Sequence, residues 1–190
     1  MDRKNIIAIL AALLLAMIAS NASAADCGGA IPCSCGDTVT SDYTMASDLG
    51  PCSSHGLIIG ADDITLDCGG HSITGDGGTG NIGISFNSRT GVTIKNCRLS
   101  GFGYGIYSAN SNSSTLTDID ASYNSQSGIR LSAGSSSNVL ANITAGGNAQ
   151  YGIFLDTSSN SNTLTGNNRN QCDRRSGIRA GIAEWQQGRR

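Results

Sequence analysis

The sequence predicts an all-β protein, a single-stranded parallel β-helix in which each repeat forms one coil of a solenoid of about four to five coils. In apolar runs of three to five residues, successive side chains are expected to point alternately inward and outward, and this two-residue period is that of a β-strand. These runs recur every 22 to 24 residues, a spacing typical of solenoids. Glycine supplies 26 of the 190 residues, while 14% are charged and two are proline. This composition excludes a coiled coil and disfavours a disordered chain.

Two interleaved series of apolar runs define the coil. The first series consists of Gly-Ile pairs spaced 22, 23 and 24 residues apart, at 83–84, 105–106, 128–129 and 152–153. The second series is centred on Ile94, Leu116, Leu140 and Leu164. Because equivalent strands stack about 4.8 Å apart, like residues of successive coils should form columns inside one continuous core.

The expected inward columns comprise the two series above and three further sets of residues. They are Phe86, Ser108, Leu131 and Leu155; Cys97, Ile119 and Ile143; and Leu99, Ala121 and Ala145. We expect Asn96, Asp118 and Asn142 at bends, since Asn and Asp tolerate left-handed backbone geometry. The Ser/Asn-rich stretches 109–114, 133–138 and 157–162 are expected to be outer loops.

The N-terminus, residues 1–24, is expected to be a signal peptide. Arg3 and Lys4 precede an apolar run that is short for a membrane span, and Ala22-Ser23-Ala24 matches a cleavage signal. Cleavage would leave a mature chain that begins near Ala25 and contains no membrane span. The predicted location is secreted, periplasmic or at the cell surface, where disulfides form.

Residues 169–190 depart from the pattern of the repeats. Six of the twelve basic residues lie there. Residues 25–168 hold four basic residues and eleven aspartates, which gives them a net charge of about −7 (4 minus 11). One interpretation is a basic tail that binds nucleic acid or an anionic surface. We favour a shifted reading frame or a truncation, because glycine codons read one base early encode Arg, Trp or Gly. Translation of the encoding DNA in all frames tests this hypothesis, which is wrong if no frame resumes the repeats.

Four of the seven cysteines, Cys27, Cys33, Cys35 and Cys52, precede the first expected coil. A solenoid end needs a cap, and we assign residues 25–56 to an N-terminal cap and residues 57–168 to the β-helix. Cys35–Cys52 is the expected disulfide of the cap, and Cys27 with Cys33 can supply a second one. Cys68 and Cys97 should lie on adjacent coils, either as buried thiols or as a disulfide.

The Gly-Ile and Val-x-Ile-x-Asn coils resemble those of right-handed parallel β-helix repeat proteins of the pectin-lyase-like superfamily, especially NosD-like, carbohydrate-associated domains. Residues 60–75, from Gly60-Ala61-Asp62-Asp63 to Ile73-Thr74-Gly75, are similar to the first coil of these secreted proteins. The resemblance covers residues 35–168 and implies right-handed winding. It says little about activity, because the superfamily holds lyases, hydrolases, binding modules and adhesins.

An enzyme of this superfamily would act on acidic polysaccharide, through calcium-binding aspartates and a base or through paired carboxylates. The residues considered for such chemistry are Asp62, Asp63, Arg98, Asp118, Asp120, Asp156 and His71. Simpler structural roles are expected for most of them. Asp62 and Asp63 would cap a turn, Arg98 and Asp120 would form a surface ion pair, and His71 would be a structural residue of the first coil. Met45, His55 and His71 do not cluster in the sequence as a copper site requires.

Tyr107, Arg130 and Phe154 occupy matching outward positions on consecutive coils, and Tyr104 and Tyr151 flank them. Aromatic faces beside hydroxyls suit weak stacking on sugars, although they also suit a plain exposed sheet. We therefore expect a secreted, non-catalytic domain that is surface-associated or weakly carbohydrate-binding, with no catalytic residue, metal site or cofactor. Its partner would be a polysaccharide or cell-surface glycan rather than a nucleic acid. One alternative is a fragment of a polysaccharide lyase, which could use calcium, or of a glycoside hydrolase. The other is a structural spacer or adhesin.

Overall fold

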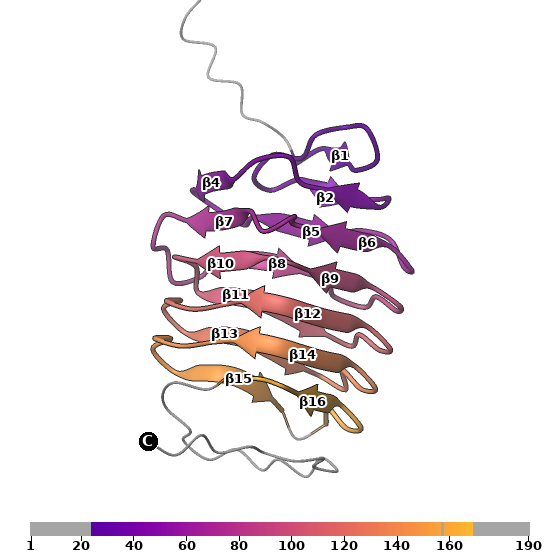
Figure 1. Ribbon diagram of the computed structural model, residues 1–190, viewed down its shortest axis with the longest axis vertical. Helices are drawn as coiled ribbons and strands as arrows, with labels where there is room; N and C mark the ends of the chain where they lie inside the picture. The colour runs from indigo at the N-terminus through magenta and orange to yellow at the C-terminus, as the bar shows by residue number, and fades with distance from the viewer. Residues whose placement is uncertain (1–23, 157, 169–190) are drawn as a thin grey trace, which may run out of the picture.

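The computed structural model describes residues 24–156 and 158–168, which wind as a parallel β-helix of about five turns (Figure 1). Coils stack along the long axis from the N-terminal end to the C-terminal end. The predicted all-β solenoid is confirmed. The strands are β1 (Asp26–Cys27), β2 (Thr38–Val39), β3 (Tyr43–Thr44), β4 (Leu49–Cys52), β5 (Leu57–Ile59), β6 (Thr65–Asp67), β7 (Ser72–Gly75), β8 (Ile82–Ser85), β9 (Thr93–Lys95), β10 (Arg98–Ser100), β11 (Tyr104–Ala109), β12 (Thr115–Asp120), β13 (Ser127–Ser132), β14 (Val139–Thr144), β15 (Tyr151–Leu155) and β16 (Thr163–Thr165).

Two parallel sheets form the walls of the solenoid. The seven-stranded sheet has the order β1-β2-β5-β8-β11-β13-β15. The nine-stranded sheet contains the remaining strands, and in it the six-residue β12 pairs with both β9 and β10 of the preceding coil. The Gly-Ile series therefore lies on the seven-stranded sheet, and the second apolar series lies on the nine-stranded sheet.

The predicted inward columns form the core between the two sheets. Ile84, Ile106 and Ile129 are fully buried and paired in register, as are Ile94, Leu116 and Leu140. Ile153 and Leu164, in the last described coil, are half-buried. Since each coil covers the apolar side chains of its neighbours, the core is continuous over the described part of the chain.

The glycine of each Gly-Ile pair is required by a close approach between coils. A Cβ on Gly105 would lie 2.7 Å from the carbonyl oxygen of Gly128, and one on Gly128 would lie 2.7 Å from that of Gly152. A side chain at this column would therefore force the backbones of successive coils apart.

The expected bends have the predicted geometry. Asn96, Asp118 and Asn142 have φ values of 55°, 54° and 55°, in the left-handed region. The Asn142 amide donates to the Asp118 carboxylate at 3.0 Å, so one bend also supports the next. Asp118 lies within β12 and Asn142 within β14, which allows one long strand to turn the corner.

The Ser/Asn-rich stretches differ from the expected outer loops, because every third side chain turns inward at one corner of the solenoid. Ser111, Ser135, Asn138 and Asn162 are all at most 3% exposed. The backbone N–H of Ser114 donates to Asn138 Oδ1 at 2.9 Å, and that of Asn138 donates to Asn162 Oδ1 at 2.8 Å. These polar columns satisfy corner backbone groups that a tight bend leaves without strand partners.

Three disulfides lie in the first coils. They join Cys27 to Cys33, Cys35 to Cys52, and Cys68 to Cys97, the last across two adjacent coils. The segment 25–56, expected to be a cap, already contributes β2 to the seven-stranded sheet and β3 and β4 to the nine-stranded sheet. The solenoid thus begins earlier than the boundary at residue 57 that the repeats suggested.

The predicted signal peptide, apart from its last residue, and the atypical segment 169–190 lie outside the described residues. Within residues 24–156 and 158–168, no helix is long and apolar enough to cross a membrane. The disulfides indicate an extracellular or periplasmic location, because such bonds persist in oxidising compartments.

Candidate functional site

The outer surface of the seven-stranded sheet carries a group of rings around one arginine, here named the arginine–aromatic cluster. It consists of Tyr104 and Tyr107 from β11, Arg130 from β13, and Tyr151 and Phe154 from β15. Tyr107 pairs with Arg130, and Arg130 with Phe154, so these three side chains form the outward column that the repeats predicted. All five side chains are half-buried.

The Arg130 guanidinium lies at the centre of this cluster. Its Cζ atom is 5.2 Å from the ring centroid of Phe154, 5.7 Å from that of Tyr104 and 6.0 Å from that of Tyr107. Each of these distances is within the range of cation–π attraction. The rings also contact one another, with centroids 5.6 Å apart for Tyr104 and Tyr107 and 4.9 Å apart for Tyr151 and Phe154.

Hydrogen bonds hold the polar ends of the cluster. Arg130 Nη1 donates to the Tyr104 hydroxyl at 3.1 Å, and the Ser132 hydroxyl donates to the Tyr107 hydroxyl at 3.2 Å. Arg130 Nε is buried and has no hydrogen-bond partner in the described part of the chain. A guanidinium has five N–H donors, so Arg130 keeps donor capacity while its plane is positioned by the surrounding rings.

The adjacent Asp62 and Asp63 serve the backbone of a bend. Asp62 Oδ1 accepts a hydrogen bond from the Thr90 N–H at 3.1 Å and lies 3.7 Å from Arg89 Nη1. Asp63 has φ 56°, in the left-handed region. The Asp62 carboxylate thus has the local role that turn capping predicts, while Asp63 contributes the left-handed backbone of the same turn.

Arg98 and Asp120 are partners in the parallel register of β10 and β12. The expected ion pair between them is not formed, since the ion pairs among the described residues are His71–Asp48, Arg89–Asp62 and Lys95–Asp67. One Asp120 oxygen instead accepts a hydrogen bond from the Ser122 hydroxyl. The preference has a local cause, because Ser122 is two residues away in the chain and needs no long side chain to be ordered.

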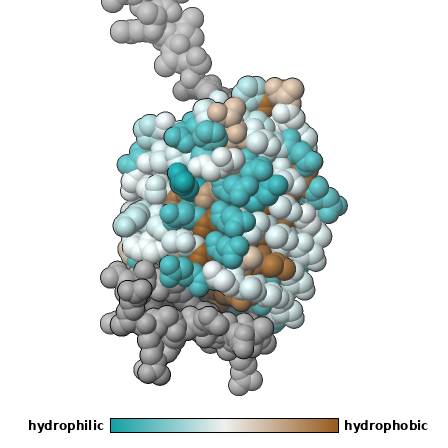
Figure 2. All heavy atoms as spheres, viewed as in Figure 1, coloured by the Kyte–Doolittle hydropathy of each residue, from teal (hydrophilic) through white to brown (hydrophobic). Residues whose placement is uncertain are grey.

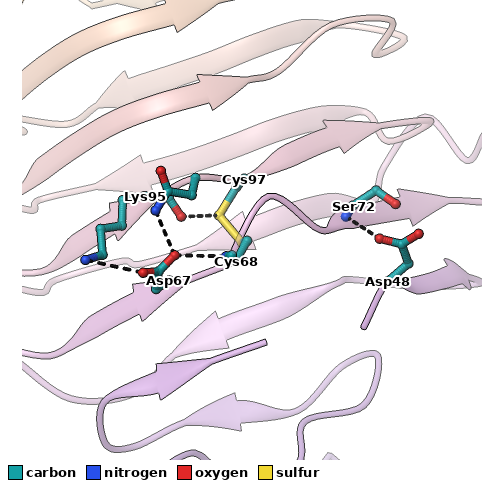
Figure 3. The surroundings of a disulfide bond; sticks show 8 residues. Asp48, Asp67, Cys68, Ser72, Lys95 and Cys97 are labelled. Atoms are coloured by element: carbon teal, nitrogen blue, oxygen red, sulfur yellow. Dashed lines mark hydrogen bonds and ion pairs between the residues drawn. A yellow bond between two sulfur atoms is a disulfide. The ribbon is translucent and has the colours of Figure 1, made fainter. Parts of the chain in front are cut away.

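Among the described residues, three carboxylates have lowered pKa values, and hydrogen bonds explain each of them. The Ser72 backbone N–H, followed by weaker contributions that include His71, lowers the pKa of Asp48. The Asn96 amide, the Gly69 N–H and Lys95 lower that of Asp67, beside the Cys68–Cys97 disulfide (Figure 3). Partial burial raises the pKa of Asp156, but hydrogen bonds from Ala133, Ser158 and Ser159 outweigh burial and lower it. A general acid needs the opposite shift, so these carboxylates are suited to anchoring turns.

The histidines and Met45 occupy separate structural positions. His55 Nδ1 accepts the Ile82 N–H at 3.0 Å, and His71 lies 3.4 Å from the Asp48 carboxylate. Met45 is buried in the core. No group of three or more His, Cys, Asp or Glu side chains among residues 24–156 and 158–168 is placed to hold a metal ion.

The face of the molecule shown in Figure 2 is mostly hydrophilic, and brown side chains interrupt it only in small areas. Among the described residues, the large hydrophobic side chains that are most exposed are Ile31, Tyr123 and Val139. Tyr123 is the residue that sequence reasoning missed, since it belongs to neither apolar series. A signal was present in the alignment of the repeats, in which Tyr123 falls between two glycines, Gly101 and Gly147.

The family comparison agrees with this architecture. The model of the right handed beta helix region matches residues 47–189, which is most of the chain. Neither a search of curated proteins nor a search of solved structures produced a match. With its stacked parallel coils and its Gly-Ile columns, the chain belongs to the right-handed beta-helix family.

Proposed function

We propose that this chain is an exported, non-catalytic β-helix domain that binds glycan weakly through the arginine–aromatic cluster. The observation that carries the proposal is the position of Arg130 within cation–π distance of Tyr104, Tyr107 and Phe154. A guanidinium can donate to sugar hydroxyls or to a uronate carboxylate. Half-buried rings beside it offer apolar surface to the C–H faces of a sugar.

We propose that the chain is related to the carbohydrate-associated, NosD-like branch of the pectin-lyase-like superfamily. Residues 60–75 and the Val-x-Ile-x-Asn coil support this relationship. The fold alone does not distinguish a binding module from an enzyme. The proposal rests instead on the cluster, where cation, rings and hydroxyls converge on one surface.

Binding measurements with variants test the cluster directly. The wild-type chain would be titrated by calorimetry with hexagalacturonate and with neutral hexasaccharides, followed by Tyr107→Ala, Phe154→Ala and Arg130→Gln. We expect each of the three variants to weaken binding about fivefold to tenfold, since each removes a stacking or charged contact. Lys95→Ala on the nine-stranded sheet is the control. Unchanged affinity in all three cluster variants would remove this function from the cluster.

Export is also proposed, on the basis of the basic start, apolar run and Ala22-Ser23-Ala24 of the chain. Expression with its own N-terminus in a secreting host should yield a product that begins at Ala25. Intact-mass measurement of the secreted product, before and after reduction and alkylation, identifies its first residue and tests whether the three disulfides are formed. A product that keeps residues 1–24 would contradict the cleavage.

A further inference from the structure

Tyr123 breaks the local rule of the solenoid at the corner between β12 and β13. Its side chain is 77% exposed, and its φ is 58°, in the left-handed region. A bulky residue in this region is an outlier, and the conformation costs about 1–2 kcal/mol. Burial of the ring does not offset this cost, because most of the ring is in water.

The neighbouring coils show what this corner normally requires. The Gly101 N–H donates to the Tyr123 carbonyl at 3.2 Å, and the Tyr123 N–H donates to the Gly146 carbonyl at 3.0 Å. One residue further on, the Phe102 N–H donates to Asn124 Oδ1 and the Asn124 N–H to Asn148 Oδ1. Gly101, Tyr123 and Gly147 are therefore equivalent, and the two glycines have φ values of 75° and 65°. A tyrosine that stands where both neighbouring coils use glycine indicates a role other than folding.

Gly147 makes room for the Tyr123 ring. A Cβ on Gly147 would lie 2.7 Å from two carbons of this ring, so the ring lies over the bare backbone of the next coil. One face of the ring is thereby supported, and the exposed remainder is available to a ligand.

A groove of about 490 Å³ adjoins the ring. It is lined by Asp120, Ser122, Tyr123, Thr144, Gly146, Gly147 and Asn168. The groove is open to solvent, its lining is about equally polar and apolar, and it has an aromatic side chain in its wall. Such a volume accommodates a sugar unit, since small-molecule sites commonly span about 300–1,000 Å³.

The Asp120 carboxylate of the groove is held in place by the buried Ser122. The buried Ser122 hydroxyl donates to Asp120 Oδ1 and accepts the Gly146 N–H at 3.1 Å. Asp120 Oδ2, the Thr144 hydroxyl and the Tyr123 hydroxyl form no hydrogen bond with any other described residue. The groove thus combines an oriented hydrogen-bond acceptor, the Asp120 carboxylate, with the hydroxyls of Thr144 and Tyr123 and with the Tyr123 ring as a stacking surface.

We propose that this groove binds one pyranose unit of a neutral glycan. The apolar C–H face of the sugar would stack on the Tyr123 ring, and a sugar hydroxyl would donate to Asp120 Oδ2. The charge of Asp120, with no Lys or Arg among the lining residues of the described chain, favours a neutral sugar over a uronate. The inference rests on the proposal that the domain binds glycan, but it places a neutral unit on a surface separate from the arginine–aromatic cluster.

The decisive variant is Tyr123→Gly, which restores the residue type of the two neighbouring coils. The full chain with its disulfides would be titrated with cellohexaose, mannohexaose and xylohexaose, with hexagalacturonate as the charged comparison. We expect at least one neutral oligosaccharide to bind, and Tyr123→Gly and Asp120→Asn each to weaken that binding about tenfold. Val139→Ala, on the outer face of the nine-stranded sheet, is the matched control and should bind like the wild type.

Thermal unfolding of the same variants separates binding from folding. Tyr123→Gly should unfold at the wild-type temperature or above it, because it relieves a left-handed tyrosine. A large drop in its unfolding temperature would instead make the ring structural and overturn the inference. If Tyr123→Gly binds neutral sugars with wild-type affinity, the inference is also overturned. The proposed function is tested separately, by the variants of the arginine–aromatic cluster. Binding of hexagalacturonate alone would overturn the neutral site and leave the cluster supported, whereas no binding of any probe would overturn both.

Discussion

At the scale of single residues, the fold depends on which positions must lack a side chain and which must accept left-handed geometry. Gly128 belongs to the first kind, because a Cβ there would lie 2.5 Å from the Ala121 carbonyl oxygen and 2.7 Å from that of Gly152. Asp118 and Asn142 belong to the second kind. The Gly-Ile repeat is therefore a steric requirement of coil stacking as well as a hydrophobic pattern.

Gly128→Ala tests this requirement. We expect a loss of about 1–3 kcal/mol in the free energy of unfolding, because neighbouring backbones must move to accept the new methyl group. Gly80→Ala is the control, since a Cβ at Gly80 meets nothing within 4 Å and its φ is not in the left-handed region. Urea unfolding followed by circular dichroism measures both variants. Equal midpoints for the two variants would contradict the close approach.

At the scale of elements, one corner of the solenoid is held together by polar columns rather than by apolar ones. Asn138 is fully buried and makes four hydrogen bonds: it accepts from the Ser114 N–H, its own N–H and its amide both donate to Asn162 Oδ1, and its amide donates to the Ser111 carbonyl. Buried backbone groups away from strands need such partners. The corner thus connects β11 with β12, and β13 with β14, without leaving buried backbone groups unsatisfied.

Asn138→Ala removes the acceptor of the Ser114 N–H and the donor to the Ser111 carbonyl. Because each unsatisfied buried group costs about 1–3 kcal/mol, we expect a loss of at least about 2 kcal/mol in the free energy of unfolding. Asn160→Ala, which changes an exposed residue of the next Ser/Asn-rich stretch, 157–162, should shift the unfolding temperature by only a degree or two, within the small range usual for surface substitutions. A similar shift in both variants would show that the corner does not depend on the column.

At the scale of the whole molecule, two kinds of interaction stabilise different parts of the solenoid. The three disulfides lie between Cys27 and Cys97, in the coils nearest the N-terminus. The buried Ser and Asn columns lie from Ser108 to Asn162, in the later coils. The early coils have shorter strands, such as the two-residue β2 and β3. Covalent links therefore occur where strand pairing is least extensive.

The disulfide between Cys68 and Cys97 joins two coils and closes a segment with a sequence separation of 29. Replacing both cysteines with alanine should lower the free energy of unfolding by about 2–4 kcal/mol, mainly because the unfolded chain regains freedom. Chemical unfolding of the double variant beside the wild type measures the loss. A double variant as stable as the wild type would show that the apolar columns alone hold these coils together.

The sequence by itself determined the solenoid, its inward apolar columns and its left-handed bends, because these follow from strand periodicity and from residues such as Ile106 and Asn142 repeating once per coil. The aromatic column could be located for the same reason, since Tyr107, Arg130 and Phe154 share one register position. Only the tertiary structure decided the pairing of Cys68 with Cys97, the inward turn of Asn138 and the contact of Tyr123 with Gly147. These features depend on how corners bend and how coils approach one another in space, and a one-dimensional period carries no information about either.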